Sequence, residues 1–370
     1  MTLSHPHHES ISRRVLAYSG LLTAAALALV VAQPASAQSS ERQPNGPDLQ
    51  PTQQWDKVFT KSERVDHRMV TFTNRYGITL VGDLYLPKDR ADRRLPAIVI
   101  SGPFGAVKEQ SSGLYAQTLA ERGFATLAFD PSYTGESGGF PRNVASPDIN
   151  TEDFSAAVDF IGLDAAVDRE RIGIIGICGW GGMALNAVAV DKRVKAVAVS
   201  TMYDMTRLMS RGYNDSVTLA ERTQTLEDLS RQRWEDAAND TPEYGPPMNE
   251  LEGGEAQFLV DYHDYYKTPR GFHPGSVNSN ASWTVTNPLS FMNMPILNYI
   301  DEIAPRPILF VHGENAHSRY FSETAYAAAA GPKELVIVPG ANHTDLYDRT
   351  DVIPFDRFAA FFQQHLAGDQ

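Results

Sequence analysis

The sequence predicts an α/β fold in which a mostly parallel central sheet is covered by helices on both faces. Short apolar runs recur along the chain, and spacers of helix length, such as residues 113–122 and 153–163, separate them. Spacers of this length indicate crossover connections between parallel strands. Runs such as residues 97–100 and 172–177 lack polar alternation, which is typical of strands buried on both sides. With 370 residues, the chain can form one large domain with an insertion or two modest domains.

Eight strands are expected from the apolar and β-branched runs. The first two are close enough in sequence to form an antiparallel hairpin, with residues 74–77 as its turn. The later strands are spaced for parallel pairing. The expected strands comprise residues 69–73, 79–86, 97–101, 125–130, 172–177, 194–200, 307–311 and 334–338.

One interval breaks this rhythm, because no central strand is evident between residues 204 and 303. A structureless segment of that length inside a compact domain is improbable. We therefore expect a helical cap at about residues 205–303, inserted before the strand at residue 307. Its aromatic residues either line a pocket or seal the cap onto the body; they are Tyr262, Tyr265, Tyr266 and Trp283.

The N-terminus has the three parts of a secretory signal peptide, at residues 1–37. Arg13 and Arg14 precede an apolar run at residues 16–32, and Ala-Ser-Ala at residues 35–37 supplies a cleavage site. The paired arginines resemble a twin-arginine signal, which implies export of the folded protein. We expect a periplasmic or extracellular protein without stable membrane association after cleavage; a membrane anchor is the alternative.

A polar segment rich in Ser, Gln, Pro, Asn and Gly follows the signal. It predicts a flexible linker at residues 38–60, so that the folded domain comprises residues 61–370.

Composition excludes several classes of partner. The formal net charge is −13, and Lys and Arg are scattered rather than clustered, so nucleic acid is an unexpected partner. The single cysteine cannot form an intramolecular disulfide, and no pair of histidines has metal-ligand spacing. We expect no metal and no cofactor. The sequence carries no feature that predicts an oligomeric state.

The chemistry is concentrated around the only cysteine, Cys178. The residues from Gly176 to Gly182 read Gly-Ile-Cys-Gly-Trp-Gly-Gly, directly after an expected strand and before a helical pattern. A nucleophile needs such a sharp strand-to-helix turn, and the helix would lower the pKa of the thiol. The alternative is a small buried hydrophobic residue, which would not need four nearby glycines. Trp180 replaces the usual second glycine, so its ring should point away from the strand.

The best candidate for a base is His343, which lies on the loop after the last expected strand. A histidine there can reach the nucleophile across the carboxyl edge of the sheet. The other histidines of the mature chain are expected on the surface or in the cap; they include His263, His273, His312 and His317.

The order of nucleophile and histidine resembles the α/β-hydrolase superfamily, from about residue 68 to the C-terminus except for the insertion. The cysteine turn is similar to that of dienelactone-hydrolase-like enzymes. Further stretches look like a bacterial subgroup related to fungal polyketide transferases, which implies esterase or acyl-transfer chemistry. These stretches are residues 108–110, Asp130 with residues 135–139, residues 171–173 and residues 305–313.

The resemblance leaves the catalytic acid open. In the family the seventh strand is followed by His-Gly-x-x-Asp, and here Ala316 stands at the last position. Glu314 is the favoured substitute, and Asp204 after the preceding strand is the alternative. The acid orients the histidine ring, so a Cys-His pair can act without it.

The oxyanion hole requires two converging N–H donors. Gly179 supplies one by the logic of the fold. Because Pro103 has no N–H group, Phe104 is the better second donor. In dienelactone hydrolases a glutamate precedes this donor, but here Gly102 does; Glu109 is expected to form a surface ion pair with Lys108.

These residues predict a thiolate of Cys178, paired with protonated His343, that attacks a small-molecule ester, lactone or thioester. The resulting acyl-cysteine passes its acyl group to water or to an alcohol. The alternative is an inactive fold that binds a ligand beneath its cap, because Ala316 occupies the usual acid position.

Overall fold

The central sheet has the predicted architecture. The computed structural model describes residues 55–248 and 250–368, in which eight strands form one sheet in the order β1-β2-β4-β3-β5-β6-β7-β8. The pairs β1–β2 and β2–β4 are antiparallel, and all other pairs are parallel. The strands are β1 (Val65–Thr73), β2 (Thr79–Pro87), β3 (Leu95–Ser101), β4 (Ala125–Phe129), β5 (Val167–Ile177), β6 (Val194–Ser200), β7 (Ile308–Gly313) and β8 (Lys333–Val338).

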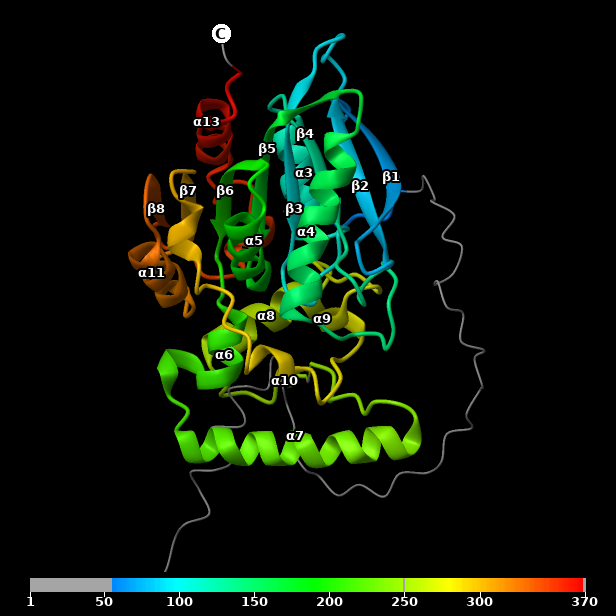
Figure 1. The fold of residues 1–370 in the computed structure, drawn as a ribbon, viewed down its shortest axis with the longest axis vertical. Helices are drawn as coiled ribbons and strands as arrows, with labels where there is room; N and C mark the ends of the chain where they lie inside the picture. The colour runs from blue at the N-terminus through cyan, green and yellow to red at the C-terminus, as the bar shows by residue number, and fades with distance from the viewer. Residues whose placement is uncertain (1–54, 249, 369–370) are drawn as a thin grey trace, which may run out of the picture.

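Helices cover both faces of the sheet (Figure 1). Strands β3, β4 and β6 are buried over nearly their whole length, which requires cover on both sides. The helices of this layer are α3 (Ser111–Ala120), α4 (Pro147–Gly162), α5 (Gly179–Val190), α11 (Arg319–Ala328), α12 (Asp345–Asp348) and α13 (Phe355–His365). Local signals fix their ends. In α4 the Ser146 side chain caps the first turn, and Pro147 follows at a position that needs no N–H donor.

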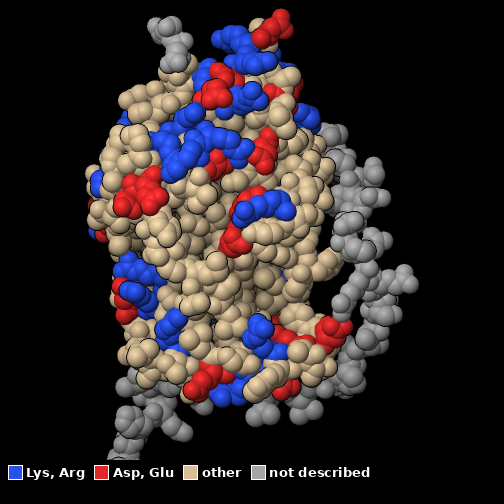
Figure 2. All heavy atoms as spheres, viewed as in Figure 1, with Lys and Arg blue, Asp and Glu red and all other residues tan. Residues whose placement is uncertain are grey.

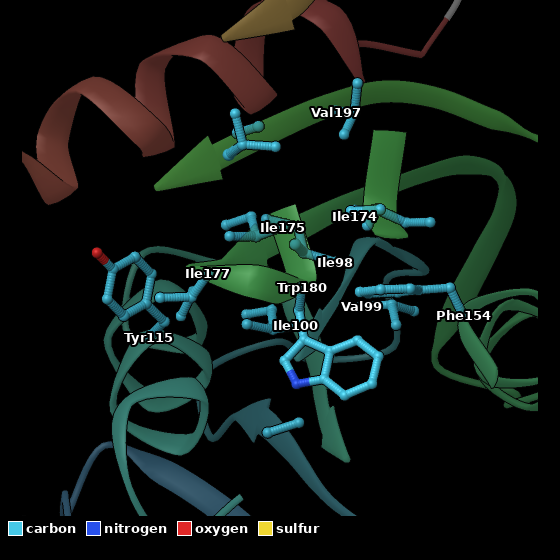
Figure 3. Close-up of a cluster of buried hydrophobic side chains, with 14 of the residues drawn as sticks. Ile98, Val99, Ile100, Tyr115, Phe154, Ile174, Ile175, Ile177, Trp180 and Val197 are labelled. Atoms are coloured by element: carbon cyan, nitrogen blue, oxygen red, sulfur yellow. The ribbon is translucent and has the colours of Figure 1, made fainter. Parts of the chain in front are cut away.

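The core lies between the sheet and these helices. Figure 3 shows isoleucine and valine side chains of β3 and β5 packed with Tyr115 from α3 and Phe154 from α4. The Tyr115 hydroxyl is buried but hydrogen-bonded, to the Ser200 hydroxyl at 2.8 Å and to the Leu346 carbonyl at 2.8 Å. The same contacts therefore tie α3 to the ends of β6 and α12.

The interval before β7 forms the predicted helical cap, which lies below the sheet in Figure 1. Within the described residues it adds no strand to the sheet, and one isolated antiparallel bridge joins Tyr244 and Thr284 inside the cap. Its elements are α6 (Met205–Arg211), η1 (Tyr213–Asp215), α7 (Leu219–Asn239), α8 (Gln257–Lys267), α9 (Val277–Asn280), α10 (Pro288–Phe291) and η2 (Ile300–Ile303).

The long helix α7 crosses the outer side of the cap. Of its side chains only Leu229 is buried, so packing contributes little to its stability. Its first turn is instead fixed by a reciprocal cap, in which Thr218 and Glu221 each accept a hydrogen bond from the other's backbone N–H.

The expected flexible linker does not extend to residue 60. The expected signal peptide at residues 1–37 and residues 38–54 lie outside the described residues, but the segment from Trp55 to Thr60 packs on the body. The Lys57 ammonium lies 3.0 Å from Asp83 and 3.3 Å from Glu109, and the Val58 N–H donates to the Glu109 carbonyl. A buried ion pair and a backbone hydrogen bond therefore anchor this segment.

The described residues contain no helix that is both long enough and apolar enough to cross a bilayer. On the face that Figure 2 shows, basic and acidic side chains are interspersed, and no extended basic stripe is present.

Candidate active site

Cys178 occupies the sharp turn between β5 and α5. Its backbone has φ 56° and ψ −128°, a conformation that costs a non-glycine residue about 1–3 kcal/mol. Its N–H donates to the Ser200 carbonyl at 3.0 Å, and its carbonyl accepts from the N–H groups of Gly181 and Tyr203 at 2.9 Å each. The neighbouring Gly176 is required by close approach, because a Cβ there would lie 2.7 Å from the Ala184 Cβ. The sequence motif thus forms the strained turn that was predicted for it.

The departure at Trp180 has a structural explanation. The residue that needs to be small is Gly181, because a Cβ there would lie 2.4 Å from the Cβ of Met202. The Trp180 ring is buried next to Phe104, with ring centroids 6.0 Å apart. In Figure 3 it lies at the margin of the core cluster. The close contact between helix and strand has therefore moved one residue along the chain.

Four donors converge on the Cys178 sulfur. The backbone N–H groups of Phe104 and Gly179 and the hydroxyl groups of Tyr347 and Tyr262 are placed to donate hydrogen bonds to its thiolate form, and each acts to lower the thiol pKa. The residue is only 6% exposed, and its burial raises the thiol pKa even though all four donors act to lower it. The expected lowering of this pKa by α5 is therefore outweighed by desolvation. In the closed site the thiol is protonated at neutral pH.

The cap holds the loop that presents Phe104. The Asn278 side chain of α9 donates to the Phe104 carbonyl at 2.7 Å, and the Ser276 hydroxyl donates to the Gly105 carbonyl at 2.8 Å. The Phe104 ring also stacks on Trp283, with centroids 4.4 Å apart. The orientation of this N–H donor thus depends on contacts with the cap.

The aromatic residues of α8 divide into two groups. Tyr262 donates to the sulfur, and the charge of Cys178 acts on the pKa of Tyr266. The Tyr265 ring instead lies 5.6 Å from the Arg270 guanidinium, and a hydrogen bond with the Ser111 backbone acts on the pKa of its hydroxyl. One side of α8 therefore faces the thiol, and Tyr265 faces away from it.

His343 lies on the loop between β8 and α12 and is buried. Its Nδ1 atom lies 2.6 Å from the Ser318 hydroxyl and 2.8 Å from the Thr201 hydroxyl, and its Nε2 atom lies 2.9 Å from the Tyr347 hydroxyl. Burial lowers the pKa of His343 well below its usual range, and the nearby His317 adds to this effect. The imidazole is therefore neutral, and the expected resting ion pair with a thiolate does not form in this closed state.

Neither expected acid reaches His343. Glu314 is exposed, and its carboxylate accepts a hydrogen bond from the Gly340 N–H at 2.8 Å. Asp204 caps α6 and accepts from the Arg207 N–H at 2.9 Å. The physical reason is that hydroxyl groups already occupy the Nδ1 side of the ring. They belong to residues after β6 and β7, the two strands after which a carboxylate was expected.

Two histidines expected on the surface or in the cap lie beside this site, where His312 is buried and His317 is half-buried. His312, at the end of β7, lies with Nε2 2.9 Å from the Ser318 hydroxyl and Nδ1 2.6 Å from the Ser322 hydroxyl. His317 is hydrogen-bonded to the Tyr203 hydroxyl. Burial lowers the pKa of each to about 3. Both are neutral members of a buried hydrogen-bond network.

The Lys108–Glu109 pair is also buried rather than at the surface. The Lys108 ammonium lies 2.5 Å from Glu109, 3.2 Å from Asp130 and 2.6 Å from Glu136, and Lys57 contacts Glu109 from the other side. Burial opposes ionisation of Glu109, but the two lysines outweigh it and lower its pKa to about 2. The described residues contain no group of three or more His, Cys, Asp or Glu side chains arranged to hold a metal ion.

Comparison with known proteins gives matches over most of the chain. Residues 98–354 match the family model described as the alpha/beta hydrolase family. The Pseudomonas aeruginosa protein PA2218 is 73% identical over 357 residues, which is 96% of each chain. Its crystal structure has a TM-score of 0.85 at 78% identity and covers 86% of this chain and 99% of that one.

Two fungal relatives carry names that state an activity. The Aspergillus aculeatus thiohydrolase aneE is 35% identical over 136 residues, 37% of this chain and 42% of that protein. The polyketide transferase grgF of a Penicillium species is 28% identical over 312 residues, 80% of this chain and 96% of that protein. The GrgF crystal structure has a TM-score of 0.67 at 24% identity, covering 82% of this chain and 100% of that one, a likeness that shows the fold alone.

Proposed function

The chain belongs to the alpha/beta hydrolase family, and from this premise we propose that it cleaves ester or thioester bonds through an acyl-cysteine intermediate on Cys178. The observation that carries the proposal is the convergence of the Phe104 and Gly179 N–H groups on the sulfur of a residue held in a strained turn. Two converging N–H groups beside a nucleophile stabilise the oxyanion of an acyl-transfer intermediate. The proposal includes a cysteine nucleophile of the dienelactone-hydrolase-like type.

The proposed reaction starts from the neutral pair. The sulfur attacks the carbonyl carbon while the thiol proton passes to His343, and the carbonyl oxygen takes the negative charge beside Phe104 and Gly179. Collapse of this intermediate expels the alkoxide or thiolate, which takes the proton from His343 and leaves an acyl-cysteine. His343 then accepts a proton from water as the water attacks the acyl carbon, and Cys178 regains its proton. Because burial disfavours separate charges, proton transfer accompanies attack.

Acyl transfer to an alcohol is a second candidate for the second step. The residue that would carry the acyl group is only 6% exposed beneath the cap, and this cover shields an acyl-cysteine from water. Similarity to the polyketide transferase grgF, at 28% identity, is compatible with such a step. Product analysis with and without an added alcohol distinguishes the two acceptors, because only transfer yields a new ester.

Trapping of the intermediate tests the function. The enzyme is mixed with a p-nitrophenyl ester or an acyl thioester, quenched in acid within milliseconds and digested for mass spectrometry. We expect the mass of the acyl group on the peptide that contains Cys178, removable by neutral hydroxylamine. His343→Gln should slow its formation about 10²–10⁴-fold, the usual contribution of general-base catalysis.

Cys178→Ala is the control, with circular dichroism to show that it folds. It should form no adduct and release no product. Unimpaired turnover by this variant would refute the acyl-cysteine mechanism, whereas a wild-type protein that binds these donors without turnover would show a ligand-binding fold.

A further inference from the structure

The nucleophile and the base of this site are joined through a third side chain. Resting on the acyl-cysteine function proposed above, we propose that Tyr347 transfers the proton between Cys178 and His343. The Tyr347 hydroxyl lies 2.9 Å from Nε2 of His343 and is also hydrogen-bonded to the Cys178 sulfur. No direct hydrogen bond between that sulfur and the imidazole occurs among the described residues. The tyrosine thus occupies the position in which the nucleophile would contact its base.

The local backbone fixes this arrangement. Tyr347 follows His343 by four residues and lies in the short helix α12, so one turn of chain carries both groups. The Asn342 N–H donates to the Asp345 carboxylate at 2.9 Å, and the Asp345 N–H donates to the Asn342 side chain at 2.8 Å. The Arg270 guanidinium of the cap pairs with Asp348 at 2.7 Å. The hydroxyl is therefore held in place from both ends of α12.

The proton balance of the relay is complete. In the resting state the thiol donates to the Tyr347 oxygen, and the Tyr347 O–H donates to Nε2 of His343. On attack the thiol proton moves to the tyrosine oxygen as the tyrosine proton moves to Nε2. Afterwards the protonated Nε2 donates to the tyrosine oxygen, and the tyrosine O–H points back toward the sulfur. Tyr347 holds one proton before and after the step, so its phenolate is never formed and its raised pKa does not impede the relay.

The hydrogen bonds at Nδ1 of His343 leave Nε2 of the same ring as the acceptor. We assign the tautomers so that Nδ1 of His343 donates to the Ser318 hydroxyl, this hydroxyl donates to Nε2 of His312, and Nδ1 of His312 donates to the Ser322 hydroxyl; the three pairs lie 2.6, 2.9 and 2.6 Å apart. In this assignment both imidazoles are neutral, and Nε2 of His343 carries no proton. Ser318 and His312 are positioning residues, because they fix the tautomer without touching the thiol.

Tyr347→Phe tests the relay, because it keeps the ring and removes only the hydroxyl. We expect the rate of acylation in a pre-steady-state burst to fall about 10²–10³-fold with KM unchanged, the magnitude usual for loss of positioned proton transfer. Acylation rates in mixtures of H2O and D2O provide a second measurement. Two protons move in the relay, so the wild-type rate should curve with deuterium fraction, and the residual Tyr347→Phe rate should vary linearly.

Two matched variants separate proton transfer by Tyr347 from the two other roles that a buried tyrosine hydroxyl can have, hydrogen bonding to the sulfur and packing. Tyr262→Phe also removes a donor to the sulfur, but the Tyr262 hydroxyl is hydrogen-bonded to Tyr203 and not to His343. It should retain the curved dependence on deuterium. Tyr265→Phe removes a hydroxyl from helix α8 that faces away from the thiol and belongs to a side chain as deeply buried as Tyr347. Its acylation rate should equal that of the wild type.

These experiments distinguish failure of the proton relay from failure of the proposed acyl-cysteine function. Wild-type acylation by Tyr347→Phe, together with no acylation by Cys178→Ala, would overturn the relay and leave the function intact. Full activity of Cys178→Ala would refute both the relay and the acyl-cysteine function. If Tyr347→Phe does not fold, the wild-type measurement decides alone, because a linear dependence on deuterium fraction excludes a two-proton transfer.

Discussion

The imidazole of His343 is held by hydroxyl groups at both nitrogens, and a hydroxyl group supports a base differently from a carboxylate. A carboxylate orients the ring and also stabilises the imidazolium that forms when the base accepts a proton. The hydroxyl groups of Ser318 and Thr201 orient the ring without neutralising its charge. A site of this kind depends on a short-lived imidazolium and on accurate placement of the ring.

This difference predicts which side chains matter for turnover. Ser318→Ala removes the shared hydrogen-bond partner of His343 and His312, so we expect kcat for a p-nitrophenyl ester to fall about tenfold or more, the loss that follows from disturbing a proton-transfer group. Glu314→Gln should leave kcat within about twofold, because that exposed carboxylate contacts Gly340 and not the base. Steady-state kinetics at pH 7.5 measure both.

Thr201→Val provides the control, since it removes the second hydroxyl at Nδ1 while keeping the shape of the side chain. It should have an effect between those of the other two variants. A loss of kcat in Glu314→Gln as large as that in Ser318→Ala would contradict the structure and restore the carboxylate as an active member of the site.

The sequence pointed to some members of this site and not to others, for a physical reason. Cys178, Gly179 and Phe104 were identifiable because a sharp turn and a prolyl residue restrict the backbone around them. Tyr347 and Ser318 lie where the sequence has no restricted pattern. The one available signal was the spacing of four residues between His343 and Tyr347, which brings two side chains together on a helical turn.

Among the structural elements, the loop between β3 and α3 is held from beneath by buried charges. Glu109 lies between the ammonium groups of Lys108 and Lys57 and is shared by both, and the Lys108 N–H donates to the Asp130 carboxylate at 2.7 Å. Removing one member of a buried ion pair leaves the other charge without compensation, which costs far more than loss of an exposed pair. The position of the Phe104 donor thus depends on the cap above it and on these ion pairs below it.

Two carboxylates that share Lys108 provide a matched test. Glu109→Gln should reduce the free energy of unfolding by about 3 kcal/mol, because two buried ammonium groups lose their common partner. Glu136→Gln should reduce it by less than about 1 kcal/mol, because the Glu136 side chain is 45% exposed. Urea denaturation of both variants measures the difference. Equal losses would show that the buried position of Glu109 confers no additional stability.

The predicted elements agree with the structure where burial decides them and differ where polar residues extend them. All eight strands are present, and β6 has the expected bounds. Strand β5 begins at Val167 rather than at residue 172, because Val167 pairs with Leu95 of β3 ahead of the polar residues 168–171, where the register shifts. The segment around Lys57 was expected to be a linker because its lysine and polar neighbours are usually exposed; a buried counter-charge from a distant segment cannot be read from local sequence.

For the molecule as a whole, the buried His312 and His343 and the half-buried His317 make stability depend on pH. Burial lowers the pKa of His312 and His317 to about 3 and that of His343 well below its usual value. Between these values and about pH 6.5, the unfolded chain binds protons that the folded protein does not. Stability is therefore complete above the unfolded pKa and decreases as the pH falls, by about 1.4 kcal/mol per pH unit for each histidine.

Urea denaturation at pH 7 and pH 5 measures this loss. Burial raises the pKa of Asp130 to about 6, so this carboxyl group makes the folded protein more stable as the pH falls, opposite to the histidines. Comparison with His317→Gln cancels that contribution, and the variant should lose about 1.4 kcal/mol less per pH unit than the wild type. An identical pH dependence in both proteins would show that His317 is not buried as a neutral group.

At this scale the fold class and the cap followed from the spacing of strands and from one long interval without them. The cover over the thiol could not be predicted in this way. Tyr262 is far from Cys178 in the sequence, and only the packing of α8 on the carboxyl edge of the sheet brings them together.

The cover over Cys178 also has a kinetic consequence. A molecule in solution cannot collide with a sulfur that lies beneath the Tyr262 hydroxyl until α8 moves. Under the proposed acyl-cysteine mechanism, each catalytic cycle would then contain a first-order step that belongs to the protein and not to the substrate. Acyl donors of very different intrinsic reactivity would approach the same maximal turnover number, set by how often the helix moves aside.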